Sequence, residues 1–171
     1  MGDPTPRHLP PVRTDDHRSG ASQRTPGASP LNNPFPTKNQ LLQACRGDLP
    51  IDHPLLHTAR ALTVLHERRL SENCCAHEET DRQRTALVRT VDNWLDKQLP
   101  PSHGAASVHT ETVGEVIDRL AQLTAAAYAA LTSACEWDLW DAWERLAELA
   151  IGYEDLATDV NSGRRRLPGC Q

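Results

Sequence analysis

The chain has 171 residues and a formal net charge of −5, which leaves room for one domain with its own core and too little for two domains of ordinary size. The acidic balance argues against nucleic acid as the main partner, because phosphate contacts depend on clustered lysine and arginine. No apolar run approaches the length of a membrane span, so we expect neither a membrane partner nor a membrane location.

The cysteines are odd in number and include no Cys-x-x-Cys pair. A disulfide framework or a zinc site is therefore not expected, and we assign no metal to the chain. Since no export signal is recognisable, the thiols indicate a reducing, cytoplasmic location. The sequence does not identify a cofactor.

Residues 1–36 are predicted to form a disordered tail. They hold more than half of the prolines and almost no periodic apolar signal, so they cannot bury enough apolar surface to offset the entropy of ordering them. They also lack the apolar stretch of a signal peptide. Residues 37–171 are predicted to form a single helical domain.

Two helices are predicted next. Thr37 can cap a short helix over about 38–46 that Gly47 ends, and Asp52 can cap a longer helix that tolerates a proline in its first turn. Along the second helix, an apolar stripe at helical spacing continues onto His66. His66 is more often a hydrogen-bonded core histidine than a ligand, and both interpretations stay open.

A third helix is predicted over about 78–99, where apolar residues form one ridge. Asp81 lies seven residues before Val88, which forms a second ridge with Leu95, so its side chain is expected at the edge of the core. A Pro-Pro pair ends the helix, and residues 102–109 are expected to form a loop.

The fourth helix is predicted over about 111–133, and Thr112 and Glu115 fit a capping box at its start. Glu111, Glu115 and Asp118 form an acidic stripe along one side. The second half of the helix is apolar nearly all round, so it is expected to be buried on every side. The acidic stripe is therefore expected to open at the mouth of a cleft between helices.

The last helix is predicted over about 138–162, with Gly163 as its stop, and Trp143 is expected to point inward with the other apolar residues. Glu154 projects onto the same apolar side, so its carboxylate needs a partner or stays protonated. No alternating strand pattern appears. The fold class is therefore predicted as all-α, a four-helix bundle-like domain with an additional short N-terminal helix and a disordered tail.

The segment Thr110-Glu-Thr-Val-Gly-Glu-Val-Ile-Asp-Arg-Leu120 resembles the signature Thr-Glu-Thr-x-Gly-x-x-Ile-Asp-Arg-Leu of an uncharacterised bacterial family, domain of unknown function 4254. The similarity extends from about His53 to Pro168. The resemblance supports the helical fold. Because the family has no established activity, the resemblance marks the signature positions without assigning them a role. The signature positions that carry over are Thr110, Glu111, Thr112, Gly114, Ile117, Asp118 and Arg119.

We expect the cleft between helices to bind a small ligand or to carry out acid–base chemistry. Arg119 can hold a carboxylate or phosphate through two hydrogen bonds, and a carboxylate beside it keeps a low pKa. The opposite interpretation, that Asp118 and Arg119 only anchor neighbouring helices through ion pairs, has equal weight. The candidate ligand-binding residues are Glu111, Asp118, Arg119, His109, Asp81, Glu115, His66 and Glu154.

Two other functions stay open. Glu78 with Asp81, and Glu115 with Asp118, place paired carboxylates one turn apart on two helices, as in all-α nucleotide pyrophosphohydrolases that hold Mg²⁺. The other alternative is a non-catalytic adaptor, because Trp137 is expected off the core face beside an acidic helix surface. That surface could dock a basic partner protein or a second copy of the chain, as a homodimer.

Overall fold

A computed structural model describes residues 33–71, 77–99, 104–132 and 136–169 of the chain. The predicted tail as far as residue 32 and the Pro-Pro pair lie outside these residues. None of the described helices combines the length and the apolar character that a membrane crossing requires. The elements of the described residues are α1 (Lys38–Cys45), α2 (Pro54–Ser71), α3 (His77–Gln98), β1 (Ser107–Val108), α4 (Val113–Ala130), α5 (Glu136–Asn161) and β2 (Arg165–Arg166).

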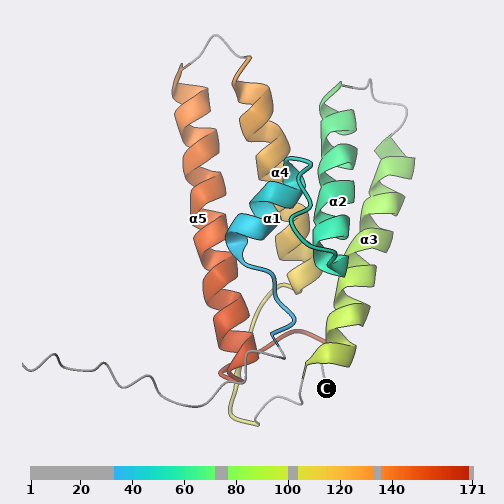
Figure 1. The fold of residues 1–171 in the computed structure, drawn as a ribbon, viewed down its shortest axis with the longest axis vertical. Helices are drawn as coiled ribbons and strands as arrows, with labels where there is room; N and C mark the ends of the chain where they lie inside the picture. Colours follow the sequence, from blue (N-terminus) through green and yellow to red (C-terminus); the bar gives the residue numbers. More distant parts are fainter. Residues whose placement is uncertain (1–32, 72–76, 100–103, 133–135, 170–171) are drawn as a thin grey trace, which may run out of the picture. The chain divides into compact units, whose positions relative to one another are not determined.

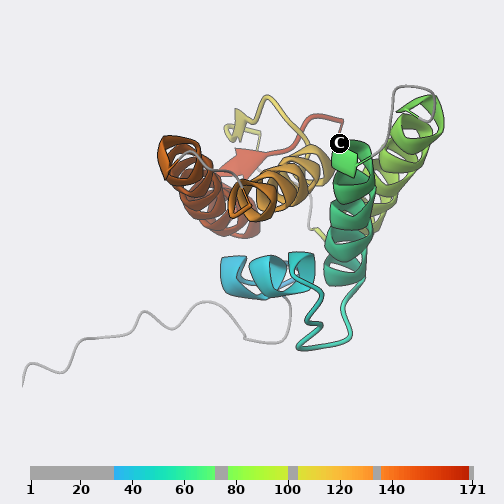
Figure 2. The same ribbon diagram turned by 90° about the horizontal axis from the view of Figure 1, so that it is seen from above.

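α4 is the central helix of the described fold. It packs against α1, α2, α3 and α5, whereas α5 packs against α4 and α1 but not against α2 or α3 within the described residues. The four long helices run lengthwise with α1 crossing them (Figure 1), and the view from above shows α1 on one face (Figure 2). α1 contacts both α2 and α5 and so links the two sides. The predicted all-α, bundle-like fold is confirmed.

Local capping residues set the helix starts. Thr37 caps α1 and Thr112 caps α4, as predicted. Each forms a reciprocal capping box with the residue three positions later, which the sequence analysis predicted only for Thr112. The predicted cap of α2 is wrong, because the Nδ1 atom of His53 accepts the hydrogen bond from the first turn, at 3.2 Å. Asp52 lies one residue too early for this contact, and its carboxylate lies 2.7 Å from Nε2 of His57 instead.

Residues 33–36, which the sequence pattern places in the tail, pack against the core. Phe35 is 6% exposed and belongs to the main hydrophobic cluster. The hydroxyl of Tyr153, a buried residue of α5, donates a 2.9 Å hydrogen bond to the carbonyl oxygen of Pro36. A buried phenol needs such a partner, and a single phenylalanine among polar residues carries no periodic signal that would have revealed the contact.

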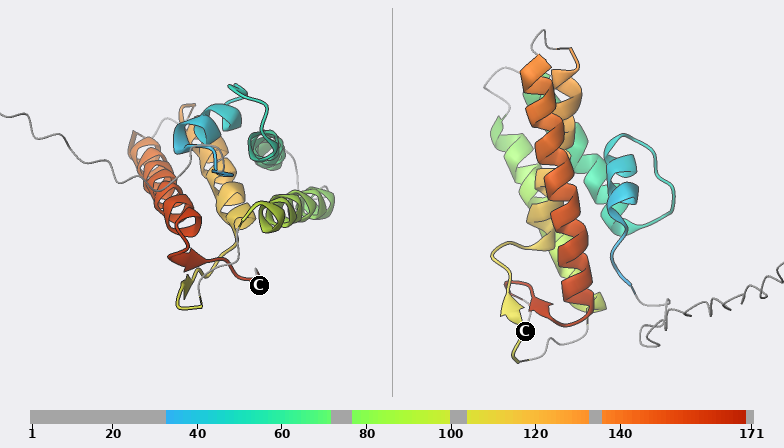
Figure 3. Two further views of the ribbon diagram at one scale, coloured as in Figure 1. Left: turned by 60° about the horizontal axis from the view of Figure 1, so that its bottom comes forward. Right: turned by 90° about the vertical axis from the view of Figure 1, so that its left-hand side faces the viewer.

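A short parallel strand pair joins the segment before α4 to the segment after α5 (Figure 3). Ser107 lies opposite Arg165 and Val108 opposite Arg166. The prediction of a simple loop over 102–109 is therefore corrected within its described part. Two residues are too few to show an alternating pattern, and the pairing follows from the helices that bring both segments together.

The far half of α4 is less enclosed than the sequence predicts. Ala125 and Ala127 are buried, but Tyr128 is 38% and Leu131 is 54% exposed. α1 has only eight residues, and the upper ends of α4 and α5 extend beyond it (Figure 1). Trp143, predicted to point inward, is 38% exposed, and its ring lies 5.7 Å from that of Tyr128 between centroids. This end of the α4–α5 pair is therefore open on one side.

Candidate functional site

Three helices meet at the carboxylate of Asp118 on α4. From α2, Nε2 of His66 lies 2.8 Å from Oδ1 of Asp118. From α3, Arg84 donates from Nε to Oδ1 at 3.2 Å and from Nη2 to Oδ2 at 2.5 Å. The guanidinium therefore binds both carboxylate oxygens, which is the strong geometry for this kind of pair. The side chains of His66 and Asp118 are only 4% and 13% exposed.

These partners keep the Asp118 carboxylate ionised. Burial alone raises the pKa of this carboxyl, but the hydrogen bonds from His66 and Arg84 outweigh burial and lower the pKa to about 2. The hydrogen bond to Asp118 in turn raises the pKa of the Arg84 guanidinium. Asp118 and Arg84 therefore form an ion pair across the whole physiological pH range.

The contacts continue from Arg84 towards the surface. Nη1 of Arg84 donates to Oδ1 of Asp81 at 2.9 Å, and Nη1 of Arg69 on α2 donates to the same oxygen at 2.8 Å. The side chains of Asp81 and Arg69 are 47% and 41% exposed, so the path leads out of the core. We call His66, Asp118, Arg84, Asp81 and Arg69 the charge network. The charge network links α2, α3 and α4. It extends from the buried contact of His66 with Asp118 to the partly exposed side chains of Asp81 and Arg69.

Sequence reasoning found the acids and the histidine of the charge network but missed both of its arginines, Arg69 and the more deeply buried Arg84. A signal for Arg84 was present in its spacing. Arg84 lies three residues before Leu87 and seven before Val91, on the line of the apolar ridge of α3. An arginine on that line faces neighbouring helices, where burial requires an acidic partner.

Arg119 and Glu111 form a separate pair. Nη2 of Arg119 donates to Oε2 of Glu111 at 2.5 Å, and the two side chains are 46% and 34% exposed. Nδ1 of His109 accepts a hydrogen bond from the backbone N–H of Glu111 at 3.1 Å. The structure thus brings these three predicted site residues together, but no hydrogen bond or ion pair of the described residues joins them to the Asp118 side chain.

The two remaining predicted acids have partners of their own. Glu115 completes the capping box of α4, since its Oε2 accepts a 2.7 Å hydrogen bond from the backbone N–H of Thr112. Glu154 forms an ion pair with Lys38 of α1, which is the kind of partner expected for a carboxylate on that side of α5. The predicted site residues are therefore divided among four separate contacts.

Gly114 allows the start of α4 to approach α3 closely. Its backbone N–H donates a 2.9 Å hydrogen bond to Oδ1 of Asp92 on α3. A Cβ atom at this position would lie 2.5 Å from the carbonyl oxygen of Val88. Burial raises the pKa of the Asp92 carboxyl above its usual value, and the hydrogen bond from Gly114, which lowers this pKa, offsets the rise only in part. The close approach also brings Asp118, one turn further along α4, within reach of Arg84.

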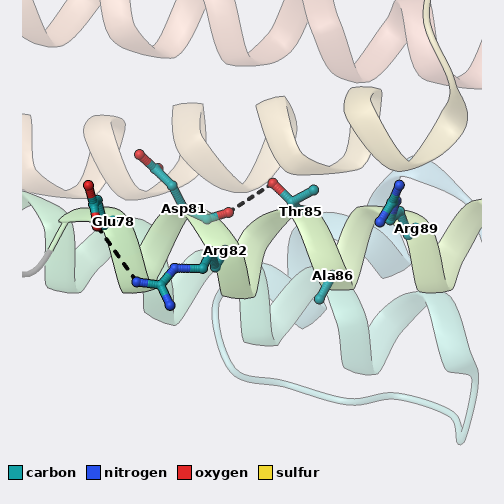
Figure 4. Close-up of a pocket in the computed structure, with 6 residues that line it drawn as sticks. All are labelled: Glu78, Asp81, Arg82, Thr85, Ala86 and Arg89. Carbon is teal, nitrogen blue, oxygen red and sulfur yellow. Dashed lines mark hydrogen bonds and ion pairs between the residues drawn. The ribbon is translucent and has the colours of Figure 1, made fainter.

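Asp81 also lines a hollow of about 560 Å³ on the exposed side of α3. Asp81, Thr85 and Arg89 project from one edge of the helix (Figure 4). The acids and arginines of the lining balance in charge, and Arg89 has no acidic partner within the described residues. The lining residues, all from α3, are Glu78, Asp81, Arg82, Thr85, Ala86 and Arg89.

The carboxylates near this hollow do not fit a metal site. Among the residues that the structure describes, no group of three or more His, Cys, Asp and Glu side chains could hold a metal ion. Arginines bind Asp81 and Asp118, Glu78 lies 3.7 Å from Arg82, and Glu115 serves as a helix cap. The paired carboxylates predicted for a Mg²⁺-dependent pyrophosphohydrolase are therefore already bound by cations or backbone.

A second hollow, of about 300 Å³, lies between α1, α4 and α5. The rings of Tyr128 and Trp143 line it, as do Leu42 of α1 and Arg46 at the C-cap of that helix. None of the predicted site residues contributes to its lining. It depends on α1, because half of its lining comes from that helix and its C-cap.

A family model described as "Protein of unknown function (DUF4254)" matches residues 57–168. The match includes every residue of the charge network and the whole of α3, but it begins after α1. Neither the curated proteins nor the solved structures include a match to this chain.

Proposed function

This chain belongs to the DUF4254 family of proteins of unknown function, and for it we propose the binding of a small polar ligand at the surface end of the charge network. The ligand carries an anionic group at one end and hydroxyl or amino donors at the other. One observation carries the proposal: Asp81 belongs both to the charge network and to the lining of the hollow on α3.

The extent of the family match supports this location. Residues 57–168 contain all members of the charge network and all residues that line the hollow on α3. The second hollow needs α1, which lies before the matched region. The extent of the match therefore favours the charge network over the second hollow as the place of a function shared by the family.

The lining of the hollow defines the chemistry of the ligand. Arg69 and Arg84 both donate their hydrogen bonds to Oδ1 of Asp81. Within the described residues Oδ2 has no such donor, so it can accept a hydrogen bond from the ligand. Arg89 can bind a carboxylate or phosphate through two parallel hydrogen bonds. Asp81 and Arg89 are separated by about 12 Å along the helix axis. A molecule that contacts both has the size of a sugar phosphate.

The buried part of the charge network positions this site without exchanging protons. Because the pKa of Asp118 is about 2, its carboxylate stays ionised near neutral pH and holds Arg84 in place. Arg84 in turn holds Asp81 at the hollow. The geometry therefore supports ligand binding more strongly than acid–base chemistry at Asp118.

Replacing Arg89 with alanine should weaken the binding of glucose 6-phosphate by about tenfold or more, since a hydrogen bond to a charged group contributes about 1.5–3 kcal/mol. Isothermal titration calorimetry on the full chain measures this change. Arg145→Ala is the matched control, because Arg145 is also an exposed arginine on a helix but lies on α5. Glucose, which lacks the anionic group, should bind the unmodified chain and the Arg89→Ala variant equally.

Two results would contradict the proposal. One is equal affinity of the Arg89→Ala and Arg145→Ala variants for glucose 6-phosphate. The other is the absence of measurable binding for glucose 6-phosphate and inorganic phosphate alike, because both present the anionic group that Arg89 is proposed to hold.

A further inference from the structure

One side of α5 presents apolar side chains to solvent at the spacing of a helix-docking surface. Trp137 is 83% exposed, Trp140 68% and Ile151 54%. Together with the exposed residues Glu144 and Ala147, they follow one another at alternating intervals of three and four residues. This spacing places all five on one stripe, as in the contact line of a coiled coil. We call these five residues the α5 seam.

The α5 seam has no helical partner in the described part of the chain. α5 packs there against α4, α1 and β2 only. The front and top views agree that α5 lies at the edge of the helices, with the others on one side of it (Figures 1 and 2). An exposed stripe that carries two tryptophans is typical of a protein-binding surface, because buried tryptophans dominate the energetics of interfaces.

The surface around the seam is acidic. α5 contains eight acidic residues and one basic residue, Arg145, which is paired with Asp141 at 3.2 Å. Glu144 lies in the seam, and Glu148 and Asp155 lie beside it, all without a cationic partner among the described residues. A partner that covers the tryptophans must therefore also bring cations, since burying these carboxylates unpaired would cost free energy.

We propose that the α5 seam docks a basic amphipathic helix of another protein. The apolar face of that helix covers Trp137, Trp140 and Ile151, and its flanking lysines or arginines pair with Glu144 and Glu148. Cations close to the exposed indole rings add an attraction of their own. This binding surface lies on α5 and is independent of the ligand site proposed on α3.

A second copy of the chain does not suit this surface. Two α5 seams placed together would bring the acids of one chain against the acids of the other, and like charges across an interface oppose association. A dimer formed through the tryptophans is therefore an outcome that contradicts the proposal.

The test uses two synthetic helices of about 20 residues, one patterned with leucine and lysine and one with leucine and glutamate. Fluorescence anisotropy of labelled peptide measures their affinity for the full chain. The leucine–lysine peptide should bind at least about tenfold more tightly, and added salt should weaken its binding. Trp137→Ala/Trp140→Ala should lower its affinity by about tenfold or more. Val64→Ala/Leu70→Ala, which removes two exposed apolar side chains of α2, is the matched control.

A charge reversal sharpens the test. The variant Glu144→Lys/Glu148→Lys should prefer the leucine–glutamate peptide, and because both positions are exposed the change should leave the fold intact. Equal binding of the leucine–lysine peptide by the Trp137→Ala/Trp140→Ala and Val64→Ala/Leu70→Ala variants would overturn the proposal. So would an unchanged peptide preference after charge reversal, or sedimentation equilibrium showing a dimer that the Trp137→Ala/Trp140→Ala variant cannot form.

Discussion

Replacing Asp118 with alanine should lower the free energy of unfolding by about 3 kcal/mol, at the lower end of the range for removing one partner of a buried ion pair. The loss is large because Arg84 and His66 remain behind without the acid that lies between them. It falls at the lower end because the Arg84 side chain is 22% exposed and regains part of its hydration. Urea unfolding followed by circular dichroism measures the difference.

Glu111→Ala is the matched control for this change. It also removes an acid that binds an arginine, but the pair of Glu111 with Arg119 is considerably more exposed. An exposed pair contributes at most about 1 kcal/mol, so this variant should remain close to the unmodified chain. Equal losses for the two variants would mean that Asp118 is no better sheltered than a surface acid, and the buried part of the charge network would then be wrong.

Gly114→Ala is expected to lower the free energy of unfolding by about 2–3 kcal/mol, as overpacking does. The added Cβ would lie 2.5 Å from the carbonyl oxygen of Val88 and 2.9 Å from Oδ1 of Asp92. A backbone carbonyl cannot turn aside as a flexible side chain can, so α4 must move away from α3. That movement also strains the hydrogen bond from Gly114 to Asp92. The same urea experiment measures the loss.

Gly152→Ala is the matched control for Gly114→Ala. It makes the same chemical change, but it is expected to raise the free energy of unfolding where Gly114→Ala lowers it. Gly152 lies inside α5, and nothing lies within 4 Å of where its Cβ would be. Alanine at this position should therefore stabilise the chain by about 1 kcal/mol, through helix propensity alone. If both variants shifted the free energy of unfolding in the same direction, the close approach of α4 to α3 would not be the reason for the glycine at 114.

The helices were predictable because their signals are local. Thr37 and Thr112 are each followed three positions later by a side chain that completes a capping box, and this pattern marks a helix start whatever surrounds it. His66 was predictable for a similar reason, since it continues an apolar stripe and is 4% exposed in the structure. The strand pair and the packing of Phe35 left no such local signal.

The pairings between helices could not be predicted from local patterns. Asp118 is followed directly by Arg119, but neighbouring residues on a helix point about 100° apart. The partner of Asp118 is Arg84, 34 residues earlier in the chain, and the partner of Glu154 is Lys38, 116 residues earlier. Which cation pairs with which acid depends on how the helices pack. The acids of the predicted stripe, Glu111, Glu115 and Asp118, therefore have different partners in the structure.

The carboxyl carbon signal of Asp118, followed by NMR from about pH 7 to about pH 3, tests the charge network most directly. The pKa of this carboxyl is lowered from 3.8 to about 2, so by about pH 3 its signal should have moved by only about a tenth of the full protonation shift. Because the folded pKa lies below the unfolded one, the contact contributes stability that is complete above the unfolded value and is lost as the pH falls through about 2. Asp118→Asn identifies the signal. A midpoint at or above 3.8 would show that Arg84 and His66 do not hold this carboxylate and would contradict the charge network.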